Sequence, residues 1–183
     1  MGKLSGRIRE VKPSLTLSIT AKAKAMRAQG VDVISFSAGE PDFDTPRQIR
    51  EAARKALKDG LTKYTPVSGI QPLKEAIAKK LKLDNNIEYS ASDIVVSCGA
   101  KHSIYNVIQV LVDSGDEVII PSPYWLSYPE MVTLAGGKVV ALPSSQDTQF
   151  KITPQQLERA ITPRTKILIL NSPSNPTGTV YTE

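Results

Sequence analysis

The stretch Lys166-Ile167-Leu168-Ile169-Leu170 runs directly into Asn171-Ser172-Pro173-Ser174-Asn175-Pro176-Thr177-Gly178. The first part is apolar without alternation, which is typical of a parallel strand that is covered on both faces. The second part is rich in Pro, Asn and Gly, so it cannot continue the strand. Because ligands bind at the carboxyl edge of open α/β sheets, this order predicts a site in which Asn175 faces a ligand. An ordinary turn without a ligand is the alternative.

Composition narrows the class of protein. Of the 183 residues, 40% are apolar and 22% charged, which is typical of a folded chain with one domain or parts of two. No apolar run approaches the roughly 20 residues of a membrane-spanning helix and no secretory signal opens the chain, so we expect a cytoplasmic location and no membrane partner. With Cys98 and His102 as the single residues of their kinds, we expect no disulfide framework and no metal site. The net charge of +5 is dispersed, so we expect no nucleic-acid partner.

Apolar periodicity predicts helices that alternate with short strands along most of the chain. Such alternation indicates parallel strands joined by crossover helices, hence an α/β fold. Helices are expected at about 16–29, 46–59, 70–83, 100–112, 124–134 and 153–161, and strands at 33–36, 94–97, 117–120, 138–142 and 166–170.

Two further loops follow predicted strands. In the loop that contains Gly99, Ala100 and Lys101, small residues lie at the start of a predicted helix. The free backbone N–H groups there, the helix dipole and the lysine charge favour the binding of a phosphate. A tight turn without a ligand is the alternative there. Trp125 follows the next strand and could stack on a flat ring, or it could simply pack against apolar neighbours. Together with Asn175, these loops suit a small phosphorylated aromatic cofactor.

Three motifs then carry a resemblance to a known family. They are Ser37-Ala38-Gly39-Glu40-Pro41-Asp42-Phe43, Ser122-Pro123-Tyr124-Trp125 and the Asn171–Gly178 stretch. In this order they resemble the N-terminal part of class I, fold-type I pyridoxal-phosphate-dependent aminotransferases, most nearly the bacterial type of aspartate aminotransferase. The resemblance covers essentially the whole chain.

The resemblance implies a three-layer α/β fold with a mostly parallel sheet that is incomplete here. Residues 1–47 would be the N-terminal arm and a small-domain segment, and residues 48–183 the first part of the large pyridoxal-phosphate domain, truncated on its C-terminal side. The full-length protein would be a homodimer with shared active sites. It would transfer an amino group between an amino acid, L-aspartate or L-glutamate, and a 2-oxo acid.

The resemblance also implies roles for single residues. The region of Gly99, Ala100 and Lys101 would bind the cofactor phosphate through backbone N–H groups, and Trp125 would stack on the pyridine ring. Asn175 would donate a hydrogen bond to the 3-oxygen of that ring and help hold the substrate carboxylate.

Other residues would reach the substrate or the neighbouring subunit. Gly39 would offer its backbone N–H to the substrate α-carboxylate, and Tyr64 would reach the phosphate bound by the neighbouring subunit. Lys101 and Lys12 would help recognise a distal carboxylate. In related enzymes a basic residue near Lys12 accompanies activity on prephenate, so a dual aspartate/prephenate specificity is one alternative, and an exposed lysine without a role is another.

The catalytic lysine of the family, which forms a Schiff base with the cofactor, is expected in sequence beyond Glu183. No lysine of this chain fits that role, so we expect a truncated, catalytically inactive and marginally stable fragment. Two rival hypotheses remain. One is a non-catalytic effector-binding module of the same fold, and the other is a thiol or hydrolase site built on Cys98 and His102.

Overall fold

The computed structural model describes residues 4–37, 39 and 41–182, so the predicted motif residues Ala38 and Glu40 lie outside it. The chain divides into two compact units. One comprises Leu15–Cys98, and the other comprises the described residues up to Ser14 together with those from Gly99 onward. The second unit contains the β-sheet and all the buried apolar side chains that the structure describes.

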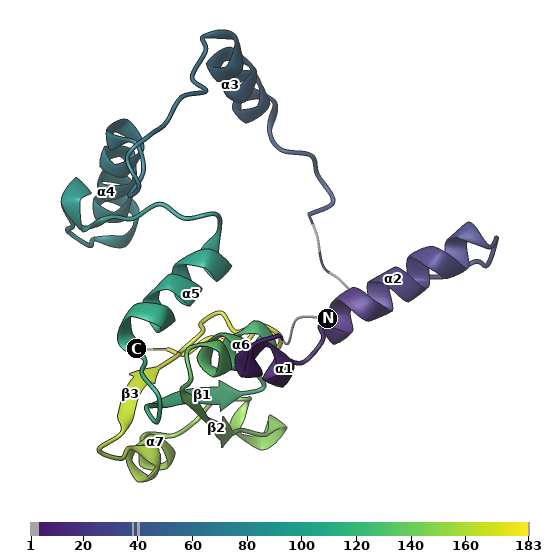
Figure 1. Ribbon diagram of the computed structural model, residues 1–183, viewed down its shortest axis with the longest axis vertical. Helices are drawn as coiled ribbons and strands as arrows, with labels where there is room; N and C mark the ends of the chain where they lie inside the picture. Colours follow the sequence, from purple (N-terminus) through teal and green to yellow (C-terminus); the bar gives the residue numbers. More distant parts are fainter. Residues whose placement is uncertain (1–3, 38, 40, 183) are drawn as a thin grey trace. The chain divides into compact units, whose positions relative to one another are not determined.

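The sheet consists of three parallel strands in the order β2-β1-β3 (Figure 1). The central strand β1 (Glu117–Ser122) pairs with β2 (Lys138–Pro143) on one side and with β3 (Thr165–Leu168) on the other. A helix lies between successive strands in the chain, as parallel pairing requires. This confirms the predicted α/β fold with a partial, parallel sheet.

The core forms around β1. Val118, Ile119 and Ile120 are fully buried, as expected for a central strand covered on both faces. Val118 and Ile120 pack in one cluster with Ile108 of helix α5 (Ala100–Leu111) and Val132 of helix α6 (Ser127–Leu134). The sheet is therefore held by side chains from the helices that precede and follow its central strand.

Six helices lie close to their predicted positions. They are α2 (Leu15–Ala28), α3 (Arg47–Lys58), α4 (Gln71–Asn85), α5 (Ala100–Leu111), α6 (Ser127–Leu134) and α7 (Pro154–Ala160). Two 3-10 turns, η1 (Ala91–Asp93) and η2 (Gln146–Thr148), accompany them. Across residues 4–37, 39 and 41–182, none of the helices is both long enough and apolar enough to cross a membrane.

One short helix was not predicted. Residues before Pro13 lack apolar periodicity, yet Gly6–Glu10 forms helix α1, which packs against α6. Just beyond this helix, the backbone N–H of Lys12 donates to Glu130 Oε2 at 2.9 Å. Tertiary contact with α6 stabilises this turn of helix, and a local sequence pattern cannot reveal such a contact.

The prediction of strands at 33–36 and 94–97 was wrong for the structure described. Neither segment pairs with another strand among the described residues. Ile34 and Phe36 are 79% and 95% exposed, and the N–H of Val96 donates to the Ser68 carbonyl in a loop. A β-branched run favours an extended backbone, but a strand also needs a neighbour to receive its hydrogen bonds.

The prediction for the last strand needs correction in its extent and burial. β3 ends at Leu168 and not at Leu170, and its side chains alternate between half-buried and exposed. Leu168 and Leu170 are therefore not covered on both faces. The reason is position, because β3 lies at the edge of the three-stranded sheet and only β1 pairs with it.

Candidate functional site

The carboxyl ends of β1 and β3 lie at the same edge of the sheet, since the two strands are parallel neighbours. Tyr124 and Trp125 follow β1, and the Asn171–Gly178 segment follows β3. Tyr124 and residues of the Asn171–Gly178 segment line one small cavity. The third predicted loop, with Gly99 to Lys101, begins helix α5 but does not follow a paired strand.

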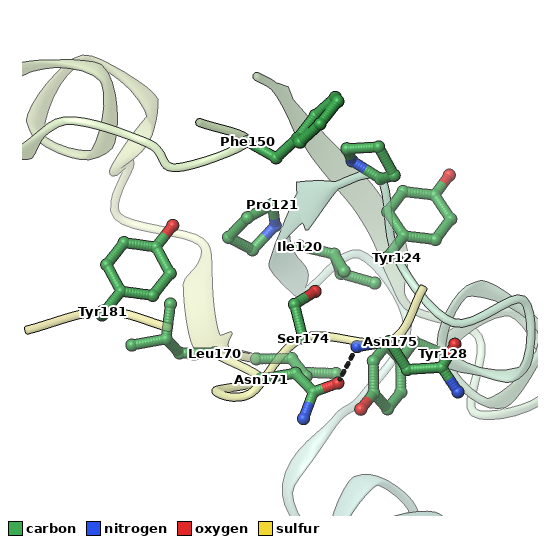
Figure 2. Close-up of a pocket in the computed structure, with 12 residues that line it drawn as sticks. Ile120, Pro121, Tyr124, Tyr128, Phe150, Leu170, Asn171, Ser174, Asn175 and Tyr181 are labelled. Atoms are coloured by element: carbon green, nitrogen blue, oxygen red, sulfur yellow. Dashed lines mark hydrogen bonds between the residues drawn. The ribbon is translucent and has the colours of Figure 1, made fainter. Parts of the chain in front are cut away.

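A small cavity lies between these loops, with a volume of about 20 Å³, enough for one water molecule. Figure 2 shows Asn171, Ser174 and Asn175 on one side of it and Ile120 and Pro121 of β1 on the other. Of the predicted site residues, only Asn175 lines this cavity. Its lining consists of Ile120, Pro121, Pro123, Tyr124, Tyr128, Phe150, Ile169, Leu170, Asn171, Ser174, Asn175 and Tyr181.

Asn175 is held through its backbone, and its side chain is exposed. Its N–H donates to the Asn171 side-chain Oδ1 at 2.9 Å, the bond drawn in Figure 2. The neighbouring Ser174 donates its N–H to the Thr179 carbonyl at 2.9 Å and accepts the Gly178 N–H at 2.7 Å. The segment is thus a closed loop that presents the amide of Asn175 at the rim of the cavity.

Helix α5 begins at Ala100, with Gly99 at its N-cap. Gly99 has a φ of 84°, in the region that favours glycine, and no atom lies within 4 Å of the position that a Cβ would take. In the first turn the N–H groups of Ala100 and Lys101 point out of the helix, because no helical carbonyl precedes them. The end of the helix is therefore open to an approaching anion.

Trp125 connects this helix end to the sheet edge. The Lys101 Nζ lies 4.9 Å from the centroid of the Trp125 ring, within the range of a cation–π contact. Trp125 is half-buried and meets Tyr128 edge to face, with ring centroids 5.3 Å apart and an interplanar angle of 88°. Burial raises the pKa of Tyr128 above its ordinary value, so this neighbour stays uncharged at neutral pH. The structure thus brings Lys101 and Trp125 together.

Three other predicted residues lie outside helix α5 and the two loops described above. Gly39 and Tyr64 belong to the Leu15–Cys98 unit, where both are exposed. Lys12 is exposed, and its backbone N–H is bonded to Glu130.

Several residues at the site received no role from the sequence. Asn171 was within the quoted motif, but only the structure shows its side chain bonded to Asn175. Tyr181 accepts the N–H of Ile152 at 2.9 Å across 29 positions of sequence. Phe150 lines the cavity with a φ of 54°. For Tyr181 and Phe150 no local signal exists, because their contacts come from chain segments that only folding brings together.

Comparison with known proteins adds the family. The family model described as "Aminotransferase class I and II" matches residues 31–183. The chain is 55% identical over 181 residues to an aspartate aminotransferase of Bacillus subtilis, covering 99% of this chain and 46% of that protein. It is 51% identical over 179 residues to an aspartate/prephenate aminotransferase of Nitrosomonas europaea, covering 98% of this chain and 45% of that one.

A solved structure of an aminotransferase has the same fold as this chain. The aspartate aminotransferase from Thermus thermophilus with maleate matches with a TM-score of 0.97 at 49% identity, covering 100% of this chain and 48% of that chain. The chain thus spans about half the length of the relatives it matches. Its fold is that of the fold-type I aminotransferases, of which it has a partial parallel sheet. On these matches the chain belongs to the aminotransferase class I and II family.

Proposed function

We propose that these residues form the N-terminal, cofactor-holding part of a pyridoxal-phosphate-dependent aminotransferase. The whole protein would transfer an amino group between L-aspartate or L-glutamate and a 2-oxo acid. The observation that carries the proposal is the family match over residues 31–183, combined with an open helix N-terminus, an indole ring in contact with Lys101 of that helix, and an exposed amide in the loop after β3.

The donor groups fit the chemistry of the cofactor. Its phosphate would accept hydrogen bonds from the N–H groups of Ala100 and Lys101 at the start of α5, and the glycine at position 99 leaves room for close approach. The cavity of about 20 Å³ is far too small for the cofactor. The cofactor would therefore lie on the open side of the edge, with the cavity behind it.

Two side chains would orient the pyridine ring. Trp125 offers a flat apolar face for stacking, and its contact with Tyr128 limits how the indole can turn. Asn175 would donate its side-chain amide to the 3-oxygen of the ring and to the substrate carboxylate. When bound, pyridoxal phosphate supplies the electron sink for amino-group transfer. Proton removal at the substrate Cα is assigned to none of these residues.

Substrate recognition would use cationic and backbone groups. We assign the distal carboxylate of a dicarboxylic substrate to Lys101, whose Nζ lies above the indole ring. Gly39 would donate its backbone N–H to the α-carboxylate, and Tyr64 would reach the phosphate bound by the neighbouring subunit of a homodimer. Full exposure of Tyr64 in its own unit is compatible with that role.

Further features of the whole protein belong to the same proposal. Residues 1–47 would be the arm and a small-domain segment, and 48–183 the first part of the large domain of a cytoplasmic homodimer. The name of the Nitrosomonas europaea relative favours a second candidate, dual aspartate/prephenate activity, in which Lys12 would help bind prephenate.

The proposal can be tested with a chimera. Residues 1–183 would be joined to the part of the Bacillus subtilis enzyme that this chain does not cover. We expect the chimera to bind pyridoxal phosphate and to convert L-aspartate and 2-oxoglutarate, with ping-pong kinetics. Asn175→Ala should lower kcat/KM by about 100-fold, the usual effect of removing one preorganised hydrogen-bond donor.

The outcomes separate the candidates. A folded chimera that retains the cofactor without transaminating either substrate would favour the non-catalytic effector-binding module. Prephenate turnover that falls in Lys12→Ala, while aspartate turnover persists, would support dual specificity. Loss of all activity in Cys98→Ala with the cofactor retained would instead support the thiol site.

A further inference from the structure

We propose that Asn171 is a positioning residue for Asn175, fixing where the Asn175 amide stands at the cofactor edge. The inference rests on the proposed function, because it explains how the chain holds a side chain that would touch the cofactor. Asn171 itself would touch neither cofactor nor substrate through this bond. It acts by accepting the Asn175 backbone N–H on its own side-chain oxygen.

The geometry of that bond is specific. Asn171 Oδ1 lies 2.9 Å from the Asn175 backbone nitrogen, across the three intervening residues (Figure 2). Asn171 is half-buried and lines the cavity, so it has a fixed base close to the end of β3. Asn175 is exposed and sits at the far end of the bond. The hydrogen bond therefore fixes Asn175 relative to the end of β3. Without it, Asn175 would move with the exposed loop.

The hydrogen bonds made by the backbone N–H groups of this loop support the positioning role of Asn171. Pro173 and Pro176 have no N–H, so they cannot anchor the segment by donating hydrogen bonds. The Ser174 N–H donates to the Thr179 carbonyl within the loop. Among the hydrogen bonds described for this loop, the one from the Asn175 N–H ties the middle of the segment back towards the strand end, because it goes to Asn171 Oδ1.

The other end of the loop is fixed separately. Ser172 Oγ accepts the Tyr181 N–H at 3.1 Å, and the Tyr181 hydroxyl accepts the Ile152 N–H at 2.9 Å. These bonds brace the chain after the Asn-Pro turn without contacting Asn175. Ser172 therefore provides a matched control, because Ser172→Ala removes a side-chain acceptor from the same loop but leaves Asn171 intact.

The first test measures the bond itself by NMR on the full chain of residues 1–183. In the parent protein we expect a scalar coupling across the hydrogen bond, between the Asn175 amide nitrogen and the Asn171 Cγ. Asn171→Ala should speed exchange of the Asn175 amide hydrogen by about 5- to 10-fold, the equivalent of one lost hydrogen bond. Asn171→Asp keeps an acceptor oxygen, so its Asn175 exchange rate should stay close to the parent rate, as should that of Ser172→Ala.

Two results would overturn the inference. One is absence of the coupling in the parent, a measurement that needs no variant to fold. The other is an Asn175 exchange rate that is the same in Asn171→Ala as in the parent. Neither readout involves the cofactor, so both stand even if the proposed function fails.

The second test connects the bond to the cofactor, using the chimera loaded with pyridoxal phosphate. The pH dependence of cofactor absorption should shift in Asn171→Ala in the same direction as in Asn175→Ala, and remain at the parent value in Ser172→Ala. A normal absorption profile in Asn171→Ala, beside a shifted one in Asn175→Ala, would contradict positioning. A normal profile in Asn175→Ala would count against the cofactor contact in the proposed function, while the exchange result would still decide the role of Asn171.

Discussion

The surroundings of Gly137 leave no space for a side chain at this position. It links helix α6 to strand β2, and its N–H donates to the Val132 carbonyl at 3.0 Å. A Cβ added there would lie 2.5 Å from Val112 Cγ1 and 3.1 Å from Val132 Cγ1. Both valines belong to the buried cluster around β1. The absence of a side chain at Gly137 is therefore a packing requirement of the core.

Gly137→Ala should destabilise the chain by about 1–3 kcal/mol, since the added methyl group overpacks a filled core. The measurement is urea unfolding followed by circular dichroism, comparing midpoints at an unchanged slope. Gly6→Ala is the matched control, because the Cβ added at Gly6 would meet no atom within 4 Å from other parts of the chain that the structure describes. Its effect should stay within about 0.5 kcal/mol. Equal midpoints for Gly137→Ala and the parent would contradict the described packing.

The Glu117 carboxylate connects secondary-structure elements, because it joins the start of β1 to the start of β2 and to the turn just before β3. It stands at the start of β1, with only 3% of its side chain exposed. Its Oε1 accepts from Arg164 Nη2 at 2.9 Å and Lys138 Nζ at 3.2 Å, and its Oε2 accepts from the Thr162 hydroxyl at 2.8 Å. The hydrogen bond from Thr162 and those from Arg164 and Lys138 lower the Glu117 pKa from 4.5 to about 2. This cluster lies at the amino end of β1, away from the candidate site.

The lowered pKa predicts a specific acid dependence. In the unfolded chain the Glu117 carboxyl recovers its ordinary pKa, so its contribution to stability is complete above pH 4.5 and is lost as the pH falls towards 2. Glu117→Gln should lower the melting temperature by several degrees at neutral pH, because Arg164 and Lys138 lose their anionic partner. Over the acid range, its stability should fall less steeply than that of the parent.

The control for this prediction is the same substitution in an exposed pair. Glu88 lies 2.6 Å from Lys82 Nζ, with both side chains largely exposed. Glu88→Gln should leave the melting temperature nearly unchanged at neutral pH, because exposed ion pairs contribute little. Thermal unfolding at a series of pH values measures both variants. Parallel acid profiles for Glu117→Gln and the parent would mean that the carboxylate is not stabilised by its partners.

At the scale of the whole molecule, burial is distributed unevenly between the two units. The buried apolar side chains described lie between Ile108 and Leu142, whereas Lys74 is the one buried residue described within Leu15–Cys98. Helices α2, α3 and α4 therefore gain little from packing within their own unit. Short helices without tertiary support are marginal in water.

Amide hydrogen exchange on the chain of residues 1–183 should reveal this difference in burial between the two units. Peptides from β1 should exchange most slowly, since the strand is buried and paired on both sides. Peptides from α2, α3 and α4 should exchange close to the rate of an unfolded chain. In the chimera, protection of α2 to α4 should rise if the added half of the Bacillus subtilis enzyme packs on them. Strong protection of these helices in the chain alone would contradict the prediction.

The sequence by itself determined the elements whose signals are local. Helical periodicity, with Gly30 and Gly60 just beyond two helix ends, located α2 to α7, and the apolar runs located β1, β2 and β3. The three motifs also pointed to the family, which the match over residues 31–183 then showed. These features depend on neighbours in the chain, which a sequence displays directly.

Tertiary structure alone decided what depends on distant partners. Within the part of the chain that the structure describes, it left the apolar segments 33–36 and 94–97 without a neighbouring strand, because a β-branched run does not encode hydrogen bonding to a second strand. It also formed α1 against α6, placed Lys101 over Trp125, and joined Glu117 to Arg164 across 47 positions of sequence. The hydrogen bond between Asn171 and Asn175 depends on both the local sequence and the tertiary structure. The motif supplied the two residues, and the folded loop brought the side-chain oxygen of one to the backbone N–H of the other.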